Sequence, residues 1–425
     1  MTKEDLKEII GSLLTIGDEI LLGDIPNGNA HHIASELRSR GFRLDKMITV
    51  GDCEEEIIQI LPMCLKKCDF LIVTGGLGPT DDDRTCAAVS KAFNRPLARN
   101  SNYAKWLEAR LFKLGIAWST QAARMAELPQ GAVKIGLEMA GFFIEHLKIP
   151  CYFLPGVPHE MRFLLEKVVI PDLEARFPNR LVYVKHVLRV QGLMESEVNR
   201  RLKDLGLEAV GVEIGYYPQV GENWVSIFAA APTEEEAQSC IRVAEVEVIA
   251  RLGSEHISGH NDESLEIVVG RELRKRGWKM AAAESCTGGL LSNKITSVSG
   301  ASDYFDRAFV TYSNEAKMEH LKVPAVLLRT HGAVSEPVAR AMAEGTRSES
   351  NVDVTLAITG IAGPTGGSPE KPVGTVFIAC ATPERTVVEK HLFDGSREHI
   401  QESAAQAALV LLWRILTHDS NLHCH

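Results

Sequence analysis

The feature that most constrains the fold is a series of short, nearly unbroken apolar segments, each separated from the next by one amphipathic stretch. Ile9–Ile16, Arg43–Val50 and Asp69–Thr74 have the length and composition of strands. Helices are predicted between them, near Asn29–Arg40 and Glu54–Lys67. Apolar strands that alternate with single helices are typical of a parallel sheet covered on both faces. The beginning of the chain therefore predicts an α/β domain.

The same alternation appears twice along the chain. A strand at Tyr152–Leu154 and a helix beginning near His159 extend the first domain, which we expect to cover residues 1–172. A second alternating region is expected over residues 262–425. Its predicted helices and strands are Leu265–Arg276, Lys279–Ala283, Leu290–Ser297, Asp353–Thr359, Gly374–Ala379 and His399–Leu416. The predicted fold class is two parallel-sheet α/β domains joined by a smaller module.

The smaller module is expected over residues 173–258. Its predicted elements are a strand at Val182–Val190, a helix at Glu195–Leu205, strands near Ile214–Pro218 and Trp224–Ala230, and a polar helix at Thr233–Leu252. This α+β pattern resembles a KH-like fold, but it contains no GxxG loop in a helix–turn–helix setting, so we expect a spacer or dimerisation module rather than a nucleic-acid binder. The polar segment Ser258–Glu263 is interpreted as a linker, so the chain is expected to divide near residues 255–262.

Charge and composition exclude several classes of protein. The net charge of −10 argues against a broad nucleic-acid footprint. No apolar run approaches the roughly 18 residues of a membrane span, and the N-terminus lacks the pattern of a signal peptide, so a cytoplasmic location is expected. The nine cysteines contain no CxxC pair and are expected to be reduced. His423, Cys424 and His425 could bind a stray metal ion, although a frayed tail is expected there.

One short pattern, TGxxGPT, occurs twice, at Thr74–Thr80 and Thr359–Thr365, each time directly after an apolar strand. Loops at the carboxyl ends of parallel strands form the ligand crevices of open α/β sheets. Glycines in such loops let backbone amides approach a phosphate or a ribose. Both segments are therefore predicted to be ligand loops.

A serine and a lysine in the second α/β domain form a candidate nucleophile–base pair. Ser285 follows a strand and precedes a helix, where free amides could stabilise an oxyanion, although a simple capping turn would give the same pattern. Ser313 is predicted to cap a helix whose first turn contains Lys317. A helix N-terminus and burial both disfavour an ammonium ion, so the amine could act as a base, although a solvated surface lysine is the alternative.

These residues lie in five motifs that resemble the nicotinamide mononucleotide deamidase domain at the C-terminus of the CinA family. The motifs are AESCTGG at 283–289, FVTYSNEAK at 309–317, HGAVSEP at 331–337, TGIAGPTGG at 359–367 and KPVGTV at 371–376. The resemblance covers residues 262–417. It implies that Ser285 is the nucleophile and Lys317 the base, that Tyr312 assists, and that no cofactor is needed. The substrate-binding residues that it implies are Glu284, Cys286, Thr287, Gly288, Gly289, Thr359, Gly360, Gly363 and Arg397, with Arg397 on the phosphate.

The first domain contains a second candidate site. Glycines and carboxylates follow the strand that ends at Thr74, and Asp82 and Asp83 suit a hard divalent cation beside a phosphate. Asp81 is interpreted as a helix-capping residue. A second polar cluster, Gly17-Asp18-Glu19, follows the first strand, and Asn27 and Asn29 open the next helix. Neither a GxGxxG fingerprint nor a P-loop is present, so ordinary dinucleotide and Walker-type sites are not predicted.

This region resembles the molybdopterin-binding-like domain of the same family over residues 8–172. The motifs are IGDEILLGDIPNGNA at 16–30, TGGLGPTDDDRT at 74–85 and LPGVPHEM at 154–161, with Gly28 where the family usually has Thr. The resemblance implies hydrolysis of ADP-ribose to AMP and ribose 5-phosphate with a divalent metal ion and potassium. The implied substrate-binding residues are Gly17, Asp18, Glu19, Asn27, Asn29, Gly75, Gly76, Gly78, Thr80, Pro155, Gly156 and Pro158, with Asp82 and Asp83 as metal ligands.

The sequence thus favours a bifunctional hydrolase of pyridine-nucleotide salvage that acts on nicotinamide mononucleotide and ADP-ribose. One alternative is a deamidase whose N-terminal domain binds a pterin or nucleotide without catalysis. Another is a competence-associated scaffold protein. We expect small-molecule nucleotides as partners, no nucleic acid, no membrane, and a homodimer, which is the commonest assembly of soluble proteins.

Overall fold

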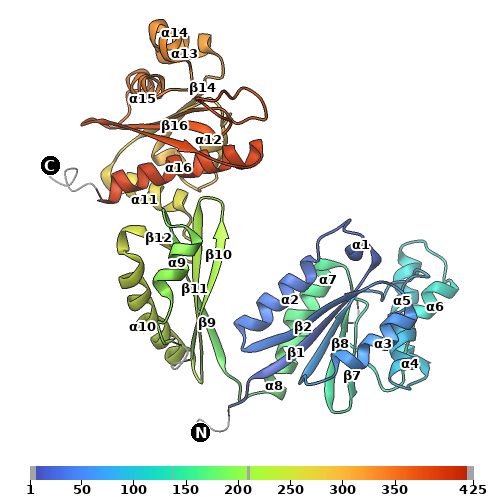
Figure 1. Cartoon of the computed structure of the whole chain (residues 1–425). Coiled ribbons are helices and arrows are strands. Elements are labelled where there is room, and N and C mark those ends of the chain that lie inside the picture. Colours follow the sequence, from blue (N-terminus) through green and yellow to red (C-terminus); the bar gives the residue numbers. More distant parts are fainter. Residues whose placement is uncertain (1–5, 137, 208–210, 419–425) are drawn as a thin grey trace. The chain divides into compact units, whose positions relative to one another are not determined.

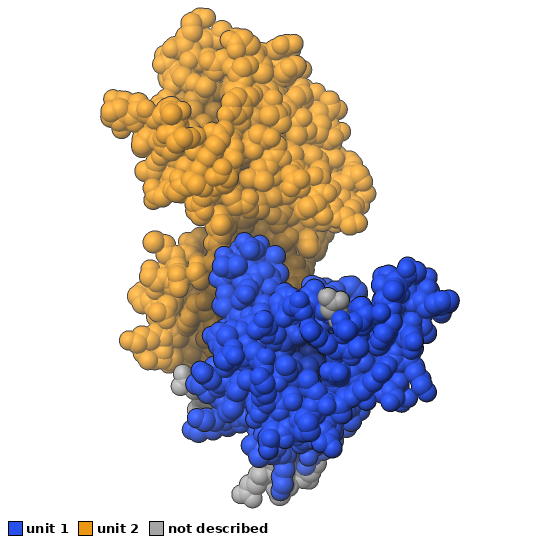
Figure 2. Space-filling view, turned by 90° about the vertical axis from the view of Figure 1, so that its right-hand side faces the viewer, with its two compact units in different colours: residues 1–184, 229–239 blue, residues 185–228, 240–425 orange. Residues whose placement is uncertain are grey.

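The computed structural model describes residues 6–136, 138–207 and 211–418 of the 425-residue chain; the tail with His423, Cys424 and His425 lies outside them. The chain forms two compact units, residues 1–184 with 229–239 and residues 185–228 with 240–425 (Figure 2). In the described part, three sheets of four or more strands carry the architecture (Figure 1). The predicted α/β class is confirmed, and both large sheets are mixed rather than purely parallel.

The N-terminal domain is built on a six-stranded sheet with the order β2-β1-β3-β8-β7-β6. β1 (Ile9–Ile16) pairs in parallel with β2 (Phe42–Val50) and β3 (Phe70–Thr74), and β3 pairs in parallel with β8 (Ile149–Leu154). The edge of the sheet is antiparallel, because β7 (Phe142–His146) forms a hairpin with β8 and pairs with the short β6, residues 133–134.

The hairpin between β7 and β8 was not predicted, and its turn residues explain why. Its turn residues, Leu147 and Lys148, have φ angles of 52° and 66°. Such left-handed turns usually contain Asn or Gly, which tolerate positive φ. The pair Leu-Lys gives no turn signal, so the antiparallel edge of the sheet was not predicted.

Apolar cores lie on both faces of this sheet. One core joins it to α3 (Glu54–Cys64) and α4 (Thr85–Ala92). The other joins it to α2 (Gly28–Ser39), α7 (Pro158–Leu164) and α8 (Ile170–Arg176). The predicted domain end at residue 172 therefore falls inside a helix that continues to residue 176. The remaining elements are α1 (Asp18–Leu21), β4 (Leu97–Arg99), α5 (Ser101–Lys113), α6 (Thr120–Met125), β5 (Glu127–Pro129) and a π-helical turn, Leu165–Val169.

The middle module contains a four-stranded sheet with the order β10-β11-β9-β12. The strands β9 (Val182–Val190), β10 (Val212–Gln219) and β11 (Glu222–Ala231) lie where strands were predicted. The helices α9 (Glu195–Leu202) and α10 (Glu234–Leu252) also agree with the prediction. The α+β character of the module is confirmed.

The interpretation of Ser258–Glu263 as a linker is wrong for its first three residues, while residues 261–263 form a turn. Residues 257–260 form β12 (Ile257–His260), which pairs antiparallel with β9. Ser258 is buried, and its hydroxyl donates to the backbone oxygen of Arg189 at 3.2 Å. Because the polar groups of this segment form hydrogen bonds within the sheet, its polar composition did not indicate a loop. The compact units accordingly do not divide near residues 255–262.

The C-terminal domain has a five-stranded sheet with the order β14-β13-β15-β16-β17. β13 (Met280–Glu284) pairs in parallel with β14 (Phe305–Val310) and β15 (Val354–Gly360). β16 (Thr375–Ala381) and β17 (Thr386–Leu392) extend the sheet in antiparallel fashion. The helices are α11 (Leu265–Arg276), α12 (Leu290–Thr296), α13 (Asn314–Leu321), α14 (Ala325–His331), α15 (Glu336–Ser350) and α16 (Arg397–His418).

Two apolar cores fill this domain, one containing residues of α11, α12 and α16 and the other residues of α14 and α15. The strand predicted at Gly374–Ala379 is present as β16, but its antiparallel direction and the following strand β17 were not predicted. None of the helices in the described residues combines the length and apolarity that crossing a membrane requires.

Candidate active sites

Ser285 lies directly after β13, an interior strand of the C-terminal sheet that runs parallel to β14 and β15. Its backbone N–H donates to the carbonyl of Ile358 at 3.0 Å, which continues the pairing of β13 with β15. Only 8% of the residue is exposed. The candidate nucleophile is therefore held at the carboxyl end of a parallel strand, where ligand crevices of such sheets form.

Lys317 reaches Ser285 from α13. Ser313 caps this helix as predicted, since its Oγ accepts from the backbone N–H of Ala316 at 3.0 Å. Lys317 is 1% exposed, and its Nζ lies 3.0 Å from Ser285 Oγ. The same amine donates to the backbone oxygens of Thr311 at 2.7 Å and of residue 312 at 3.3 Å. The structure thus brings together two side chains that lie 32 positions apart in the sequence.

The electrostatics of this pair favour a neutral amine. Burial lowers the pKa of Lys317 to about 8, and the nearby Cys286 acts in the opposite direction. The oxygens that accept from Nζ belong to neutral groups, so the amine has no carboxylate partner among these contacts. Burial also raises the pKa of Cys286 to about 11, which keeps this thiol protonated near pH 7. Ser285, and not the adjacent cysteine, is therefore the group placed for activation.

Glu284 holds the turn that follows the serine. It is fully buried, and its carboxylate accepts from the backbone N–H groups of Gly289, Leu291 and Ser292 at 2.9, 3.1 and 2.8 Å. The Ser292 hydroxyl also donates to this carboxylate, so a substrate contact would have to replace one of four bonds. The expectation that the first helical amides are free for an oxyanion is wrong for these three groups. The amides of Cys286 and Thr287, which have no partner within the described residues, are the remaining candidates.

The turn itself is compact and mostly buried. Cys286 and Thr287 are both 4% exposed, and Gly288 and Gly289 adopt φ angles of 62° and 107°. Thr287 Oγ1 is buried without a hydrogen-bond partner in the described part of the chain. A buried hydroxyl without a partner is costly, which makes this group a candidate for contact with a ligand.

The second glycine loop approaches this turn. A Cβ atom at Gly360 would lie 3.1 Å from Cys286 Sγ, so the absent side chain allows the two loops to touch. Thr359 is buried, and its hydroxyl donates to the backbone oxygen of Ala333 in the HGAVSEP motif at 2.9 Å. These contacts bring the motifs AESCTGG, TGIAGPTGG and HGAVSEP together beside Ser285.

Arg397 and Tyr312 close one side of the site. Arg397 donates to the backbone oxygen of Gly363 at 2.7 Å and to the Tyr312 hydroxyl at 2.8 Å. Tyr312 is 62% exposed, and its phenol faces Arg397 rather than the serine. The role of Tyr312 that the resemblance implies therefore has a contact with the guanidinium but none with the nucleophile in this structure.

The N-terminal domain has an open pocket of about 470 Å³ at the carboxyl ends of its parallel strands. Tyr103, Trp106 and Arg110 of α5 line one side. At Gly75 a Cβ atom would lie 2.0 Å from the backbone oxygen of Ile16, so only glycine fits. The predicted residues that line the pocket are Gly17, Glu19, Gly75, Gly76, Gly78, Asp82, Asp83, Pro155 and Gly156.

An adjoining hollow of about 170 Å³ contains further predicted residues, Asn27, Asn29 and Pro158. Asn27 caps α2, and its Nδ2 donates to Thr15 Oγ1 at 3.1 Å. Asn29 Nδ2 donates to the backbone oxygen of Gly156 at 2.7 Å. Both asparagines thus position loops around the pocket. A Cβ at Gly28 would meet open space, so the departure from the usual threonine causes no packing defect.

Asp52 is the site residue that sequence reasoning missed. Its carboxylate accepts from the backbone N–H of Asp18 at 3.0 Å, and its own N–H donates to Asp18 Oδ1 at 3.2 Å. Burial raises the pKa of Asp52, the hydrogen bond from the backbone N–H of Asp18 partly offsets this, and the nearby negative charges raise the pKa further. A signal was present, because Gly51-Asp52 follows β2 in the same way as Gly17-Asp18 follows β1.

The three consecutive aspartates have different surroundings. Asp81 does not cap a helix, because α4 begins only at residue 85; instead it pairs with Arg124 at 2.9 Å on the surface. Asp83 accepts from the backbone N–H of Thr80 at 2.9 Å and holds the loop. Thr80 lines a neighbouring hollow rather than the main pocket. Asp82 is exposed in the pocket.

The carboxylates of this pocket fit a hard cation by their chemistry. Glu19, Asp52 and Asp82 line it, so three carboxyl groups face the same space. In the described residues, however, no three ligand atoms of this pocket come within 4.8 Å of one another. Such a set suits an ion like Mg²⁺, which is commonly bound by one or two carboxylates together with the phosphates of a substrate.

The fold and sites together define a multidomain α/β protein with a glycine-lined acidic pocket in one domain and a buried serine–lysine pair in another. Three domain families match in chain order: "Probable molybdopterin binding domain" over residues 12–175, "Damage-inducible protein CinA KH domain" over 185–257 and "CinA C-terminal domain" over 262–416. The chain belongs to the CinA family.

Relatives match over nearly their whole length. A "CinA-like protein" of Syntrophobacter fumaroxidans is 68% identical, with 98% of each chain covered, and one of Syntrophus aciditrophicus is 41% identical, with 96% of this chain and 98% of the relative covered. A crystal structure of "competence/damage inducible protein CihA" from Agrobacterium tumefaciens is 39% identical over 35% of this chain and 91% of its own, with a TM-score of 0.34.

Proposed function

We propose that the C-terminal domain hydrolyses the carboxamide of nicotinamide mononucleotide to nicotinate mononucleotide and ammonia. The observation that carries the proposal is the 3.0 Å contact between Ser285 Oγ and the buried Nζ of Lys317. A serine beside an amine of lowered pKa is a recurrent nucleophile–base pair in acyl transfer. The motif resemblance supports the choice of substrate.

The proposed reaction has two halves. Neutral Lys317 takes the proton of Ser285 Oγ as the oxygen attacks the carboxamide carbon. Collapse of the tetrahedral intermediate breaks the C–N bond, and the lysine proton leaves with ammonia. Water then attacks the acyl-serine ester while Lys317 again serves as base, which releases the carboxylate and regenerates the serine. The amides of Cys286 and Thr287 are the proposed oxyanion donors.

Arg397 is the proposed phosphate-binding group of this site. Its guanidinium is held by a backbone oxygen and a phenol, both neutral, so its charge has no carboxylate partner in these contacts. A planar guanidinium can bind a phosphate through two parallel hydrogen bonds. We propose that the phosphate exchanges for the contact with Tyr312.

The test is ammonia release from nicotinamide mononucleotide by purified full-length protein. Ser285→Ala is expected to abolish ammonia release. Ser297→Ala is the control and should retain it, because the Ser297 hydroxyl makes only a local hydrogen bond to the backbone oxygen of Lys294. If the wild-type protein releases no ammonia, or if Ser285→Ala retains activity, the proposal is wrong.

We propose a second activity, hydrolysis of ADP-ribose to AMP and ribose 5-phosphate, in the N-terminal pocket. The supporting observation is the combination of a glycine loop, carboxylates and the aromatic ring of Trp106 around one pocket. The glycine-loop amides would bind the pyrophosphate, and Trp106 would stack on the adenine. Glu19, Asp52 and Asp82 would hold a divalent ion, which when bound supplies charge neutralisation and an activated water.

AMP release from ADP-ribose in the presence of Mg²⁺ separates this activity from the two alternatives. A non-catalytic nucleotide- or pterin-binding domain would bind ligand without releasing AMP. A competence scaffold would do neither, and a gel-shift experiment at moderate salt would test whether it contacts DNA directly.

A further inference from the structure

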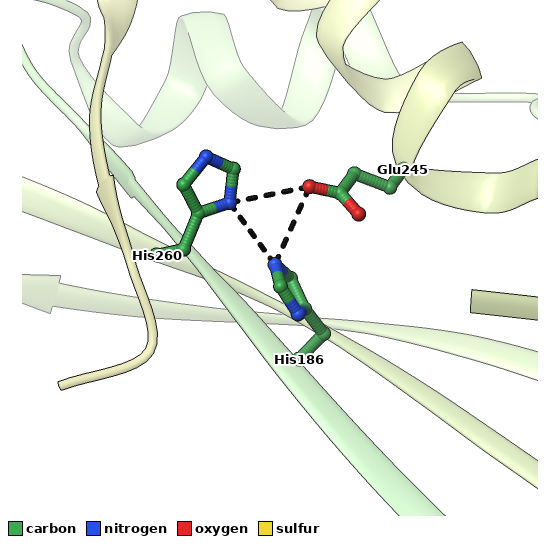
Figure 3. A group of neighbouring side chains, drawn as sticks. All are labelled: His186, Glu245 and His260. Atoms are coloured by element: carbon green, nitrogen blue, oxygen red, sulfur yellow. Dashed lines mark hydrogen bonds and ion pairs between the residues drawn. The ribbon is translucent and has the colours of Figure 1, made fainter. Parts of the chain in front are cut away.

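We infer that the middle module contains a divalent transition-metal site formed by His186, Glu245 and His260, with zinc as the ion that its ligands suit best. His186 lies on β9, Glu245 on α10 and His260 at the end of β12. Figure 3 shows the three side chains pointing toward one another. The site is separate from both candidate active sites and does not depend on either proposed activity.

The distances match tetrahedral coordination. His186 Nε2 lies 3.1 Å from His260 Nδ1 and 3.4 Å from Glu245 Oε1, and His260 Nδ1 lies 3.2 Å from the same oxygen. Zinc binds nitrogen and oxygen at roughly 2.0–2.2 Å, which places neighbouring tetrahedral ligand atoms about 3.3–3.6 Å apart. The observed triangle is thus within a few tenths of an ångström of the size needed.

Hydrogen bonds alone leave this triangle incomplete. Each imidazole nitrogen carries at most one proton and the Glu245 carboxylate carries none, so at most two hydrogens serve three short contacts. At least one pair of electronegative atoms is then held at 3.1–3.4 Å with no hydrogen between them. A cation at the centre would interact favourably with all three atoms.

The backbone holds the ligands in place. The N–H of Asn261 donates to the backbone oxygen of Val187 at 2.8 Å, and Asn261 Oδ1 accepts from the N–H of Val187 at 3.0 Å. These bonds fasten the end of β12 beside His186. The outer nitrogen of His186, Nδ1, makes only a 3.5 Å contact with the Asn261 amide, so no strong bond opposes the tautomer that a metal requires.

The ligand types select the ion. Two imidazoles and one carboxylate suit zinc and other late first-row metals, whereas Mg²⁺ and Ca²⁺ prefer oxygen ligands. Three protein ligands leave a fourth position, and the His260 side chain is 42% exposed, so water can reach it. Among the described residues, this is the one group of three or more His, Cys, Asp or Glu side chains whose ligand atoms all lie within 4.8 Å of one another.

The test is Zn²⁺ titration of chelator-treated full-length protein against a chromophoric chelator, with excess Mg²⁺ present to occupy carboxylate sites. We expect Glu245→Gln and His260→Gln each to lose one equivalent of bound zinc. Glu247→Gln, on the same helix, and His256→Gln, in the same module, should lose none. The C-terminal His-Cys-His sequence is common to all variants, so zinc bound there cancels in the comparison.

A second measurement keeps the proposal testable if a histidine variant folds poorly. Zinc is expected to raise the Tm of the wild-type and Glu247→Gln proteins but not of Glu245→Gln, because an ion that binds only the folded state stabilises it. Co²⁺ should give the visible absorption of a tetrahedral site in the same two proteins. Equal zinc stoichiometry in Glu245→Gln and Glu247→Gln, or equal Tm shifts, would overturn the assignment.

Discussion

Each of the two candidate sites contains a TGxxGPT loop, but the sites differ in whether their reacting side chains are already in contact. In the C-terminal site the reacting side chains are buried and already in contact, with Lys317 1% exposed and 3.0 Å from the serine. In the N-terminal pocket Asp82 and Glu19 are exposed. Among the described residues that line this pocket, no three metal-ligand atoms lie within 4.8 Å of one another. A nucleophile–base pair must be assembled in advance, whereas a pocket for an ion and a pyrophosphate can be completed by its ligands.

The largest expected effect tests the preassembled pair. Ser285→Ala and Lys317→Gln should each lower kcat for nicotinamide mononucleotide by roughly a thousandfold or more, as losses of a nucleophile or its base do elsewhere. Lys317→Arg should be nearly as damaging, because a guanidinium stays protonated. AMP release from ADP-ribose in the same proteins should be unchanged.

Lys322→Arg is the matched control, since Lys322 lies just after the same helix and its amine donates to the backbone oxygen of Glu319 at 2.7 Å. A Lys317→Arg protein with near-normal deamidation would remove lysine from the mechanism, and a loss of both activities would show that the sites are not independent.

The next effect is the pH dependence of the two activities. Deamidation needs the neutral amine, so kcat should rise with pH and level off above the lowered pKa of Lys317, about 8. Between pH 8 and pH 6 the rate should fall about fiftyfold, because about half of the amine is neutral at its pKa and only about 1% two pH units below it. ADP-ribose hydrolysis does not depend on a neutral amine, so its rate should not fall in parallel with deamidation over this range. If the two activities had the same pH profile, the neutral amine of Lys317 would not be what distinguishes them.

A smaller effect is expected in the N-terminal pocket. Asp52→Asn and Asp82→Asn should reduce AMP release about tenfold to a hundredfold and raise the Mg²⁺ concentration needed for half-maximal rate, because each removes an oxygen ligand for the ion. Asp81→Asn should change little, since its ion pair with Arg124 is on the surface, where such pairs contribute about 0–1 kcal/mol. Equal effects of all three substitutions would mean that these residues hold the loop and not an ion.

The smallest effect concerns the support of the serine turn. Glu284→Gln should lower the unfolding free energy by about 2 kcal/mol, because a buried carboxylate that accepts three amide bonds is replaced by a weaker acceptor. Urea titration measures this change, with the exposed Glu315→Gln as control. Comparable stability of the two variants would show that the turn does not depend on the carboxylate.

The predictability of the structure followed the strength of local signals. Apolar strands such as β1 and β15 and capped helices such as α13 were identified because periodicity and capping residues are local properties. The hairpin at Leu147-Lys148 and the polar strand β12 were not, because pairing across the sheet determines them. Asp52 was missed for a related reason, since its carboxylate becomes a site residue only when the ends of β1 and β2 lie side by side.

The serine–lysine pair was predictable as a hypothesis from Ser285 and Lys317, aided by the five motifs. What the sequence could not supply was the dominant cause of the lowered lysine pKa, which is burial and not the helix terminus alone. Nor could it show that Glu284 occupies the helix amides. Both depend on packing between distant segments.

The crowding at Gly75 bears on how the N-terminal pocket could acquire new substrates. Any side chain there would collide with the backbone of β1, so random mutagenesis of that position should yield only inactive clones. The opposite wall is free of this constraint, because Trp106 and Arg110 of α5 present side chains to the same space. Selection for altered specificity should therefore accumulate substitutions on α5 while leaving the glycine loop untouched.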